Sequence, residues 1–369
     1  MVDALTPAQP EEHGTKSTRD AVATRAALES WLRTKEHNAR IVEMTAPDAN
    51  GMSSETLLFE AEWDVDGAPQ RQRLVARVAP YATDVPVFPS YDLEMQFRVI
   101  EAVAAAGTVP VPIPRWLELD ASVLGQPFFI MDRVDGRVPP DVMPYTFGSW
   151  LTEASAADQQ HLQNASVRTL AAIHAIPVSE NVRAHLERST GGTTPLVRDV
   201  QHWRKYYEWV RGADRYPLLE AGFDWLTSNW PVDEGEAVLT WGDARIGNMM
   251  FDGFDPVAVL DWEMATVAPR GVDVGWMSFL HTFFQDITEV MQMPGLPNFM
   301  RLDDVIASYE SAANVTLTDM NFYEVYAALR HGIIMARTHQ RRVHFGEAEP
   351  VANPDDAVMH GARLAAMIS

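Results

Sequence analysis

The sequence predicts an α+β protein with two lobes, a small antiparallel sheet followed by a larger and mostly helical part. Strand-like runs at 55–65 and 70–79 flank the turn dipeptide Asp66-Gly67, a pattern typical of a hairpin. Beyond Gly136, apolar residues recur mainly at helical spacing. The 369 residues are enough for two lobes with substantial cores.

The smaller lobe is expected over residues 19–133, after a loose polar tail at 1–18. In two stretches of this lobe, at 20–35 and 91–106, apolar side chains recur every three or four residues, which predicts helices. Two further strands are expected near 115–119 and 127–131.

The larger lobe is expected over residues 134–369 and begins with an irregular segment. Helical periodicity then dominates, and short strands interrupt it around residues 238–260. The expected helices cover 157–176, 196–211, 216–230, 272–284, 302–312, 319–338 and 354–368.

The composition limits the partners of the chain. The net charge is −22, from 29 basic and 51 acidic residues, and such a surface repels nucleic acid. It would attract a cationic substrate, although solubility explains the acidity equally well. No apolar run approaches the ~18 residues of a membrane helix, and the N-terminus lacks the apolar core of a signal peptide. The absence of cysteine rules out thiolate chemistry. We therefore expect a cytoplasmic protein without nucleic-acid or membrane partners.

The most informative segment is LTWGDARIGNMMFDGFDPVAVLDWE, at residues 239–263. In it, Gly242 permits a tight backbone before Asp243, whose carboxylate can accept a hydrogen bond from a hydroxyl and orient that oxygen toward a phosphorus. Turn dipeptides then return the chain as a strand that ends at Asp261, beside Asn248. The oxygens of these two side chains are hard ligands that suit Mg²⁺ on a nucleotide triphosphate. Taken singly, each residue is equally typical of a turn or a cap.

Two motifs in this segment, GDARIGN and VLDWE, resemble the catalytic and metal-binding segments of the aminoglycoside phosphotransferase-like kinases. Four other segments resemble the same family: LVARVAP its phosphate-contacting strand, FFIMDRVDGRVPP its hinge strand, LAAIHAI the helix before the catalytic loop, and GVDVGW a later structural segment. The resemblance covers about residues 51–273. It implies the two-lobed protein-kinase fold and the phosphorylation of a small molecule.

The resemblance also implies a role for each residue of the central segment. Asp243 would be the catalytic base or hydroxyl-orienting group, and Asn248 and Asp261 would hold Mg²⁺. Arg245 would contact phosphate or pair with an acid. Asp273 would brace the backbone of the catalytic loop and take no part in the chemistry.

On the nucleotide side, the resemblance implies that Asp132 and Val134 offer a backbone carbonyl and amide to adenine. Arg77 stands where the family has a lysine on the phosphates, and arginine keeps the charge but is longer and forked. The acid that pairs with that lysine aligns with Gln96, and an Arg77–Gln96 hydrogen bond would replace the ion pair more weakly. An alternative alignment uses Glu94, nearly on the opposite helix face.

Two further positions depart from the usual pattern of the family. The segment 51–54 stands where the phosphate-covering loop should be, so Ser53 and Ser54 would contact phosphate through hydroxyls and backbone amides. A plain hairpin turn is the alternative. Trp241 replaces a histidine that commonly precedes the Gly-Asp pair, and we expect activity to survive because that position serves packing.

The function implied is a Mg²⁺-dependent transfer of the γ-phosphoryl group of ATP or GTP to a hydroxyl of a small molecule, an aminoglycoside or another hydroxyl metabolite. The altered pair at Arg77 and Gln96 leaves open a non-catalytic nucleotide-binding protein of the same fold. Retention of Asp243, Asn248 and Asp261 favours the enzyme, because a pure scaffold needs none of them. A metal-dependent phosphohydrolase would need more carboxylates and histidines near the metal.

Overall fold

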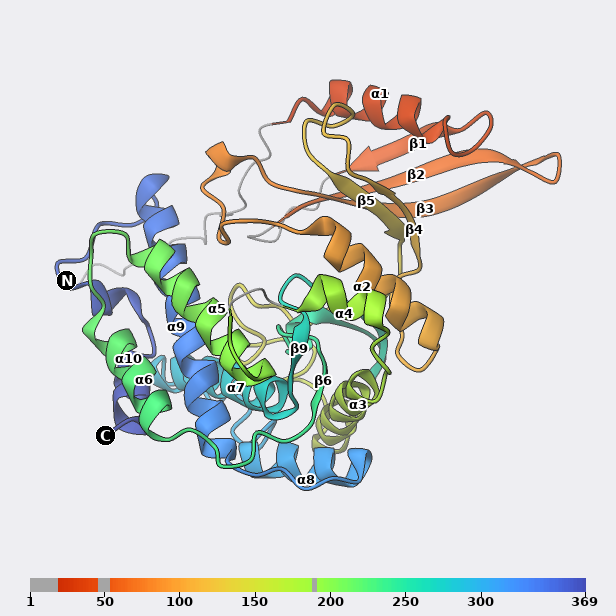
Figure 1. Cartoon of the computed structure of the whole chain (residues 1–369). Helices are drawn as coiled ribbons and strands as arrows, with labels where there is room; N and C mark the ends of the chain where they lie inside the picture. The colour runs from red at the N-terminus through yellow and green to blue at the C-terminus, as the bar shows by residue number, and fades with distance from the viewer. Residues whose placement is uncertain (1–18, 46–53, 188–190) are drawn as a thin grey trace, which may run out of the picture. The chain divides into compact units, whose positions relative to one another are not determined.

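The computed structural model describes residues 19–45, 54–187 and 191–369. They fall into two compact units (Figure 1). The smaller unit comprises the chain up to Pro86 together with Arg115–Arg133, and the larger comprises Val87–Pro114 and Val134–Ser369. In the part of the chain that is described, no helix combines the length and the apolar character needed to cross a membrane.

The smaller unit is a five-stranded sheet in the order β1-β2-β3-β5-β4. Its strands are β1 (Arg40–Thr45), β2 (Glu55–Val65), β3 (Ala68–Val78), β4 (Pro114–Glu118) and β5 (Phe128–Asp132). The hairpin of β2 and β3 turns through Asp66 and Gly67, whose φ angles of 53° and 81° are those of a tight hairpin turn. This confirms the expected hairpin.

The helix α1 (Ala21–Leu32) packs on this sheet (Figure 1). The carboxylate of Asp20 caps its first turn by accepting from two backbone amides. Leu28 and Leu32 are fully buried and form one hydrophobic core with Phe59 and Ile130 from the strands. The alternation of buried and exposed residues along the strands therefore creates the face on which the helix rests.

The segment 87–114, which the sequence assigned to the smaller lobe, belongs by its contacts with the larger unit. It carries α2 (Leu93–Ala106), which ends at Gly107 in the left-handed conformation. The hydroxyl of Tyr206 donates to the carbonyl of Val87 at 2.9 Å, and the amide of Val259 donates to the carbonyl of Pro110 at 2.8 Å. These long-range bonds explain the assignment.

The other helices of the larger unit follow the expected order, with one addition and one interruption. A short helix at residues 180–186 was not expected. The predicted continuous helix at 354–368 is wrong, because the chain forms a 3₁₀ turn at Pro354–Ala357 and resumes as a helix at Gly361. The helices are α3 (Ala156–His174), α4 (Glu180–Leu186), α5 (Pro195–Arg211), α6 (Pro217–Ser228), α7 (Gly271–Val290), α8 (Leu302–Ala313), α9 (Met320–His344) and α10 (Gly361–Met367).

The interruption before α10 coincides with a buried polar contact. The imidazole Nε2 of His360 hydrogen bonds to the carbonyl of Ala328 on α9 at 2.8 Å. His360 is only 5% exposed, and burying its ring nitrogen without a hydrogen-bond partner would cost free energy. We attribute the interruption of the helix to this contact.

Helices α7 and α9 lie side by side at the centre of the unit and approach closely (Figure 1). A methyl group added at Gly275 would lie 2.8 Å from the backbone of Tyr323, and one at Gly271 would lie 2.3 Å from its ring. Small residues on α7 therefore set the distance between the two helices.

Two short antiparallel pairs of strands frame the central segment. They are β6 (Ala237–Thr240) with β9 (Thr266–Pro269), and β7 (Met249–Asp252) with β8 (Asp255–Val259). The chain from the end of β6 to the start of β7 forms the loop that carries Asp243. The strand β9 was not expected from the sequence.

Candidate active site

The loop between β6 and β7 begins with a glycine that no other residue can replace without strain. Gly242 has a φ of +88°, and a methyl group there would lie 2.2 Å from the carbonyl oxygen of Met264. Both the conformation and the contact require a missing side chain. The expected tight backbone before Asp243 is confirmed.

Asp273, at the start of α7, holds the backbone of this loop through its carboxylate. Its two carboxylate oxygens accept the backbone amides of Trp241 at 2.6 Å and Gly242 at 2.9 Å. The fully buried carboxylate also contacts Nε2 of His174 at 3.1 Å, and Nδ1 of that ring lies 2.6 Å from the hydroxyl of Tyr309. The expected bracing role of Asp273 is therefore confirmed by these contacts.

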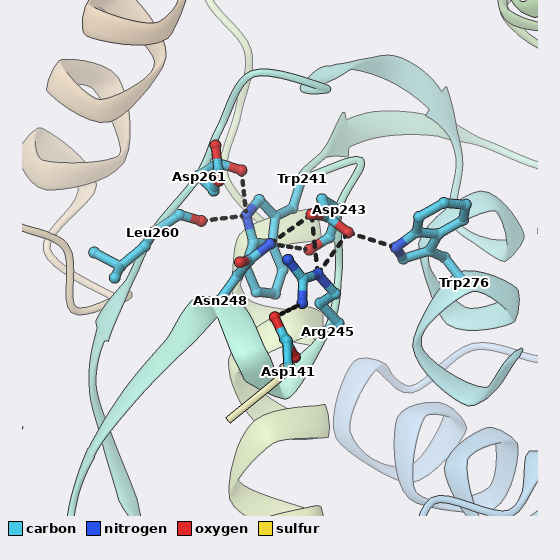
Figure 2. A network of polar contacts seen from close by, with 8 residues as sticks. All are labelled: Asp141, Trp241, Asp243, Arg245, Asn248, Leu260, Asp261 and Trp276. Atoms are coloured by element: carbon cyan, nitrogen blue, oxygen red, sulfur yellow. Dashed lines mark hydrogen bonds and ion pairs between the residues drawn. The ribbon is translucent and has the colours of Figure 1, made fainter. Parts of the chain in front are cut away.

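The carboxylate of Asp243 is held by three side chains (Figure 2). The amide Nδ2 of Asn248 donates to Oδ2 at 2.7 Å, and the indole Nε1 of Trp276 donates to Oδ1 at 2.8 Å. The Nε of Arg245 lies 3.1 and 3.0 Å from the two oxygens. The side chain is 14% exposed. A carboxylate has about four acceptor positions, so this one is fixed in orientation and still able to accept from a hydroxyl.

Arg245 lies between two carboxylates, those of Asp243 and Asp141 (Figure 2). Burial alone would lower the pKa of its guanidinium, but the charges of the two carboxylates outweigh that effect and raise the pKa. The sequence left open whether Arg245 contacts phosphate or pairs with an acid. In the structure it pairs with the two acids.

The hairpin of β7 and β8 brings Asn248 and Asp261 together. The amide of Leu260 donates to the carbonyl of Asn248 at 2.8 Å, and Asp261 follows directly, as Figure 2 shows. Asp261 has a φ of +57°, an unusual conformation for a residue with a side chain. The indole Nε1 of Trp241 fixes it by donating to the carbonyls of Leu260 at 2.8 Å and Asp261 at 3.2 Å.

These two side chains have the donor set that Mg²⁺ prefers. Because Nδ2 of Asn248 is engaged by Asp243, its oxygen is the end of the amide left for a cation, and Asp261 adds a carboxylate. Among the described residues, no group of three or more His, Cys, Asp or Glu could hold a metal on its own. An ion at this place would therefore take most of its ligands from phosphate and water.

A model of the phosphotransferase enzyme family matches residues 50–293, about two thirds of the chain. The chain belongs to this family.

Among curated proteins, acyl-CoA dehydrogenase family member 11 of Homo sapiens is 27% identical over 259 residues, covering 68% of this chain and 31% of the human protein. Family member 10 of Mus musculus is 26% identical over 286 residues, covering 73% of this chain and 24% of the mouse protein. This phosphotransferase therefore spans about a third or less of the length of the curated relatives it matches.

Solved structures confirm the fold. A candidate aminoglycoside phosphotransferase of Ralstonia eutropha is 25% identical, with a TM-score of 0.62 over 93% of this chain and 96% of that one. The aminoglycoside phosphotransferase APH(4)-Ia, in a ternary complex with AMP-PNP and hygromycin B, is 17% identical, with a TM-score of 0.55 over 92% and 99% of the two chains. The expected α+β, kinase-like fold is thus the fold of this phosphotransferase.

Of the residues expected on the nucleotide side, Arg77, Ser54 and Asp132 belong to the smaller unit, and Gln96 and Val134 to the larger one. Arg77 on β3 donates through Nη1 to the hydroxyl of Thr56 on β2 at 3.0 Å. Ser54 is 2% exposed, and its buried hydroxyl has no hydrogen-bond partner among the residues that the structure describes. Gly51 and Ser53 lie outside the described residues.

The side chain of Asp132, at the end of β5, is engaged on the sheet. Its carboxylate accepts Nε and Nη2 of Arg115 at 2.6 and 2.8 Å. This leaves only main-chain groups of Asp132 for adenine, as the resemblance implies. Val134, expected to supply the amide, is the first residue of the second stretch of the larger unit, Val134–Ser369.

Gln96 and Glu94, the alternatives for the partner of Arg77, differ sharply in their surroundings. Gln96 is 3% exposed on α2, whereas the side chain of Glu94 is 36% exposed and its carboxylate lies 3.8 Å from Nη2 of Arg98. A buried amide needs a partner, so burial favours the alignment with Gln96. Because α2 and β3 belong to different units, the pairing with Arg77 stays a prediction.

Two residues of the site were missed in the sequence, Asp141 and Trp276. Asp141 is 104 positions from Arg245 in an irregular segment, and no local signal marks it. Trp276 follows Asp273 by three positions on one helix, a spacing that places both side chains on the same face. That spacing could have identified Trp276 once Asp273 was assigned to the loop.

Proposed function

We propose that this phosphotransferase transfers the γ-phosphoryl group of ATP or GTP to a hydroxyl of a small molecule. The observation that carries the proposal is the carboxylate of Asp243, oriented by three donors, one of which is Asn248. The main-chain bond from Leu260 to Asn248 places Asp261 next to the same residue. A non-catalytic protein would have no use for this arrangement.

Each residue contributes by position. Asp243 accepts the hydrogen of the acceptor hydroxyl and directs its oxygen toward the phosphorus. Asn248 and Asp261 would hold Mg²⁺, which neutralises charge on the phosphate oxygens when it is bound with the nucleotide. Arg245 neutralises the charge of a second acid, the partly exposed Asp141, so that Asp243 keeps its orientation.

A second group of residues would hold the nucleotide. We propose that Arg77 contacts the phosphates with support from Gln96, and that Ser53 and Ser54 cover them. The unpartnered hydroxyl of Ser54 supports this part of the proposal. The main chain of Asp132 and Val134 would bind the base.

Two acceptor classes have support. An aminoglycoside is supported by the acidic chain, with its net charge of −22, and by the hygromycin B complex of a protein that shares the fold. A hydroxyl-bearing acyl thioester is supported by the curated relatives, whose names place a comparable segment in acyl-CoA dehydrogenase family members.

The first experiment tests catalysis. Asp243→Ala is expected to lower Mg²⁺-dependent turnover of ATP by about 10²–10⁴-fold while nucleotide binding persists. Asp261→Ala is expected to weaken binding of Mg²⁺–ATP itself. The matched control is Asp224→Ala, at an exposed position of α6. Unchanged turnover in Asp243→Ala would refute the mechanism, and wild-type protein that binds ATP without any turnover would establish the non-catalytic alternative.

The second experiment identifies the acceptor. ADP release is measured with a panel that contains a kanamycin-type aminoglycoside, an amino alcohol, a sugar and a hydroxyacyl thioester. Saturable ADP release with one class, lost in Asp243→Ala, assigns that class. Expression in a drug-sensitive host adds an independent test, because an aminoglycoside kinase would confer resistance.

A further inference from the structure

The indole of Trp276, which donates to the carboxylate of Asp243, has the guanidinium of Arg330 over its ring. The mechanism above assigns no role to this guanidinium. We propose that Trp276 and Arg330 form a buried positioning pair, in which the cation of Arg330 polarises the indole that holds Asp243. This inference rests on the proposed function, since it assigns a purpose to the orientation of Asp243.

Trp276 makes a specific polar contact as well as a packing contact. It is 2% exposed, and its Nε1 donates to Oδ1 of Asp243 at 2.8 Å (Figure 2). An indole has only this one donor. Its ring plane is fixed by the surrounding core, so the direction of the N–H, and with it the orientation of the carboxylate, has little freedom.

Arg330 lies over a face of that indole. It is 2% exposed, and its guanidinium carbon is 4.4 Å from the centroid of the Trp276 ring. The same group is 5.0 Å from the ring of Tyr326 and 5.5 Å from that of Trp203. Its Nη2 donates to the carbonyl of Val272 at 3.1 Å, and within the described part of the chain its buried Nε has no hydrogen-bond partner.

Burying the guanidinium of Arg330 costs free energy, because a charged group is removed from water. Aromatic faces and one carbonyl stabilise a buried cation less well than a carboxylate would. A cation against one face of an indole draws electron density from the ring, which makes the N–H a more polar donor. The positive charge of Arg330 therefore strengthens the hydrogen bond from Trp276 to Asp243. The bond to Val272, four residues before Trp276 on α7, holds the cation in register with that ring.

The contact is tested without any acceptor by NMR of the full chain carrying ¹⁵N-labelled tryptophan. The indole signal of Trp276 is assigned by its loss in Trp276→Phe. We expect Asp243→Asn and Arg330→Met, which removes the positive charge, each to move the indole proton of Trp276 upfield. The signal of Trp230, whose Nε1 donates to Glu234 at the same distance of 2.8 Å, should stay in place. A Trp276 signal that Arg330→Met leaves unmoved overturns the inference, and one that Asp243→Asn leaves unmoved overturns the contact with Asp243.

The consequence for catalysis is tested by Mg²⁺–ATP turnover. Trp276→Phe keeps the ring stack and loses the N–H, so we expect kcat to fall roughly 10- to 100-fold with the KM for ATP within about twofold. Trp230→Phe loses an equivalent bond to a carboxylate and should leave both constants unchanged. A wild-type kcat in Trp276→Phe overturns the positioning role while Asp243→Ala stays inactive. If the proposed function fails instead, the wild-type protein itself shows no turnover.

Discussion

The brace under the catalytic loop offers the sharpest test of the structural reasoning. Asp273→Asn keeps the shape of the side chain but replaces one acceptor oxygen by a donor. Both oxygens accept buried backbone amides, at 2.6 and 2.9 Å, so at least one amide must lose its partner. An unsatisfied buried donor costs about 1–3 kcal/mol, and bonds to a charged acceptor are stronger than average, which gives about 3 kcal/mol in total.

This loss is measurable as a melting temperature. For a domain of roughly the size of the larger unit, 1 kcal/mol corresponds to about 2–4 °C, so Asp273→Asn is expected to lower the Tm by roughly 6–12 °C. The control is Asp224→Asn, an equal change of charge at an exposed position, which should stay within about 2 °C of the wild type. A Tm for Asp273→Asn that matches this control would refute the assignment of Asp273 as a brace.

Three further outcomes are expected. Gly242→Ala should destabilise by more than about 2 kcal/mol in urea unfolding, because its methyl group would lie 2.2 Å from a carbonyl oxygen, whereas Gly253→Ala, with φ +58° and open space, should cost about 1 kcal/mol. Burial lowers the pKa of His281 to about 4, so as the pH falls from about 6.5 the unfolded chain binds a proton that the folded chain refuses. Stability should therefore fall by roughly 2–3 kcal/mol more between pH 7 and about 4.5 in the wild type than in His281→Asn; equal slopes would contradict this. Arg245→Met should leave the charges of two partly buried carboxylates uncompensated and cost about 1.5–3 kcal/mol, and a loss below about 1 kcal/mol would show that the pairing is unimportant.

The parts of the fold that were predictable from the sequence are those in which local pattern and tertiary contact agree. The hairpin of β2 and β3 was visible because Asp66-Gly67 sits between two alternating runs. The long helices were visible because their apolar faces are buried against one another. The relation of Asn248 to Asp261 followed from a hairpin whose turn residues are unambiguous.

The parts that were not predictable depend on contacts far apart in the chain. The strand β1 and the helix α4 are too short to show a period. The end of the chain reads as one helix until His360 is drawn to a carbonyl on α9. Asp141 and Trp276 join the site only because folding brings them to Arg245 and Asp243, across separations of 104 and 33 residues.

The arrangement of α7 has a practical use beyond this chain. Asp273 and Trp276 are three positions apart on this helix. The carboxylate of Asp273 accepts backbone amides of the loop, and the indole of Trp276 donates to the carboxylate of Asp243 in the same loop. Inserting or deleting one residue between them would turn Trp276 by about 100° around the helix and point the indole away from the loop. The spacing is therefore a geometric signature: among sequences with a Gly-Asp loop, a tryptophan three places after the bracing aspartate marks those able to build the same support, and it can be searched for without a structure.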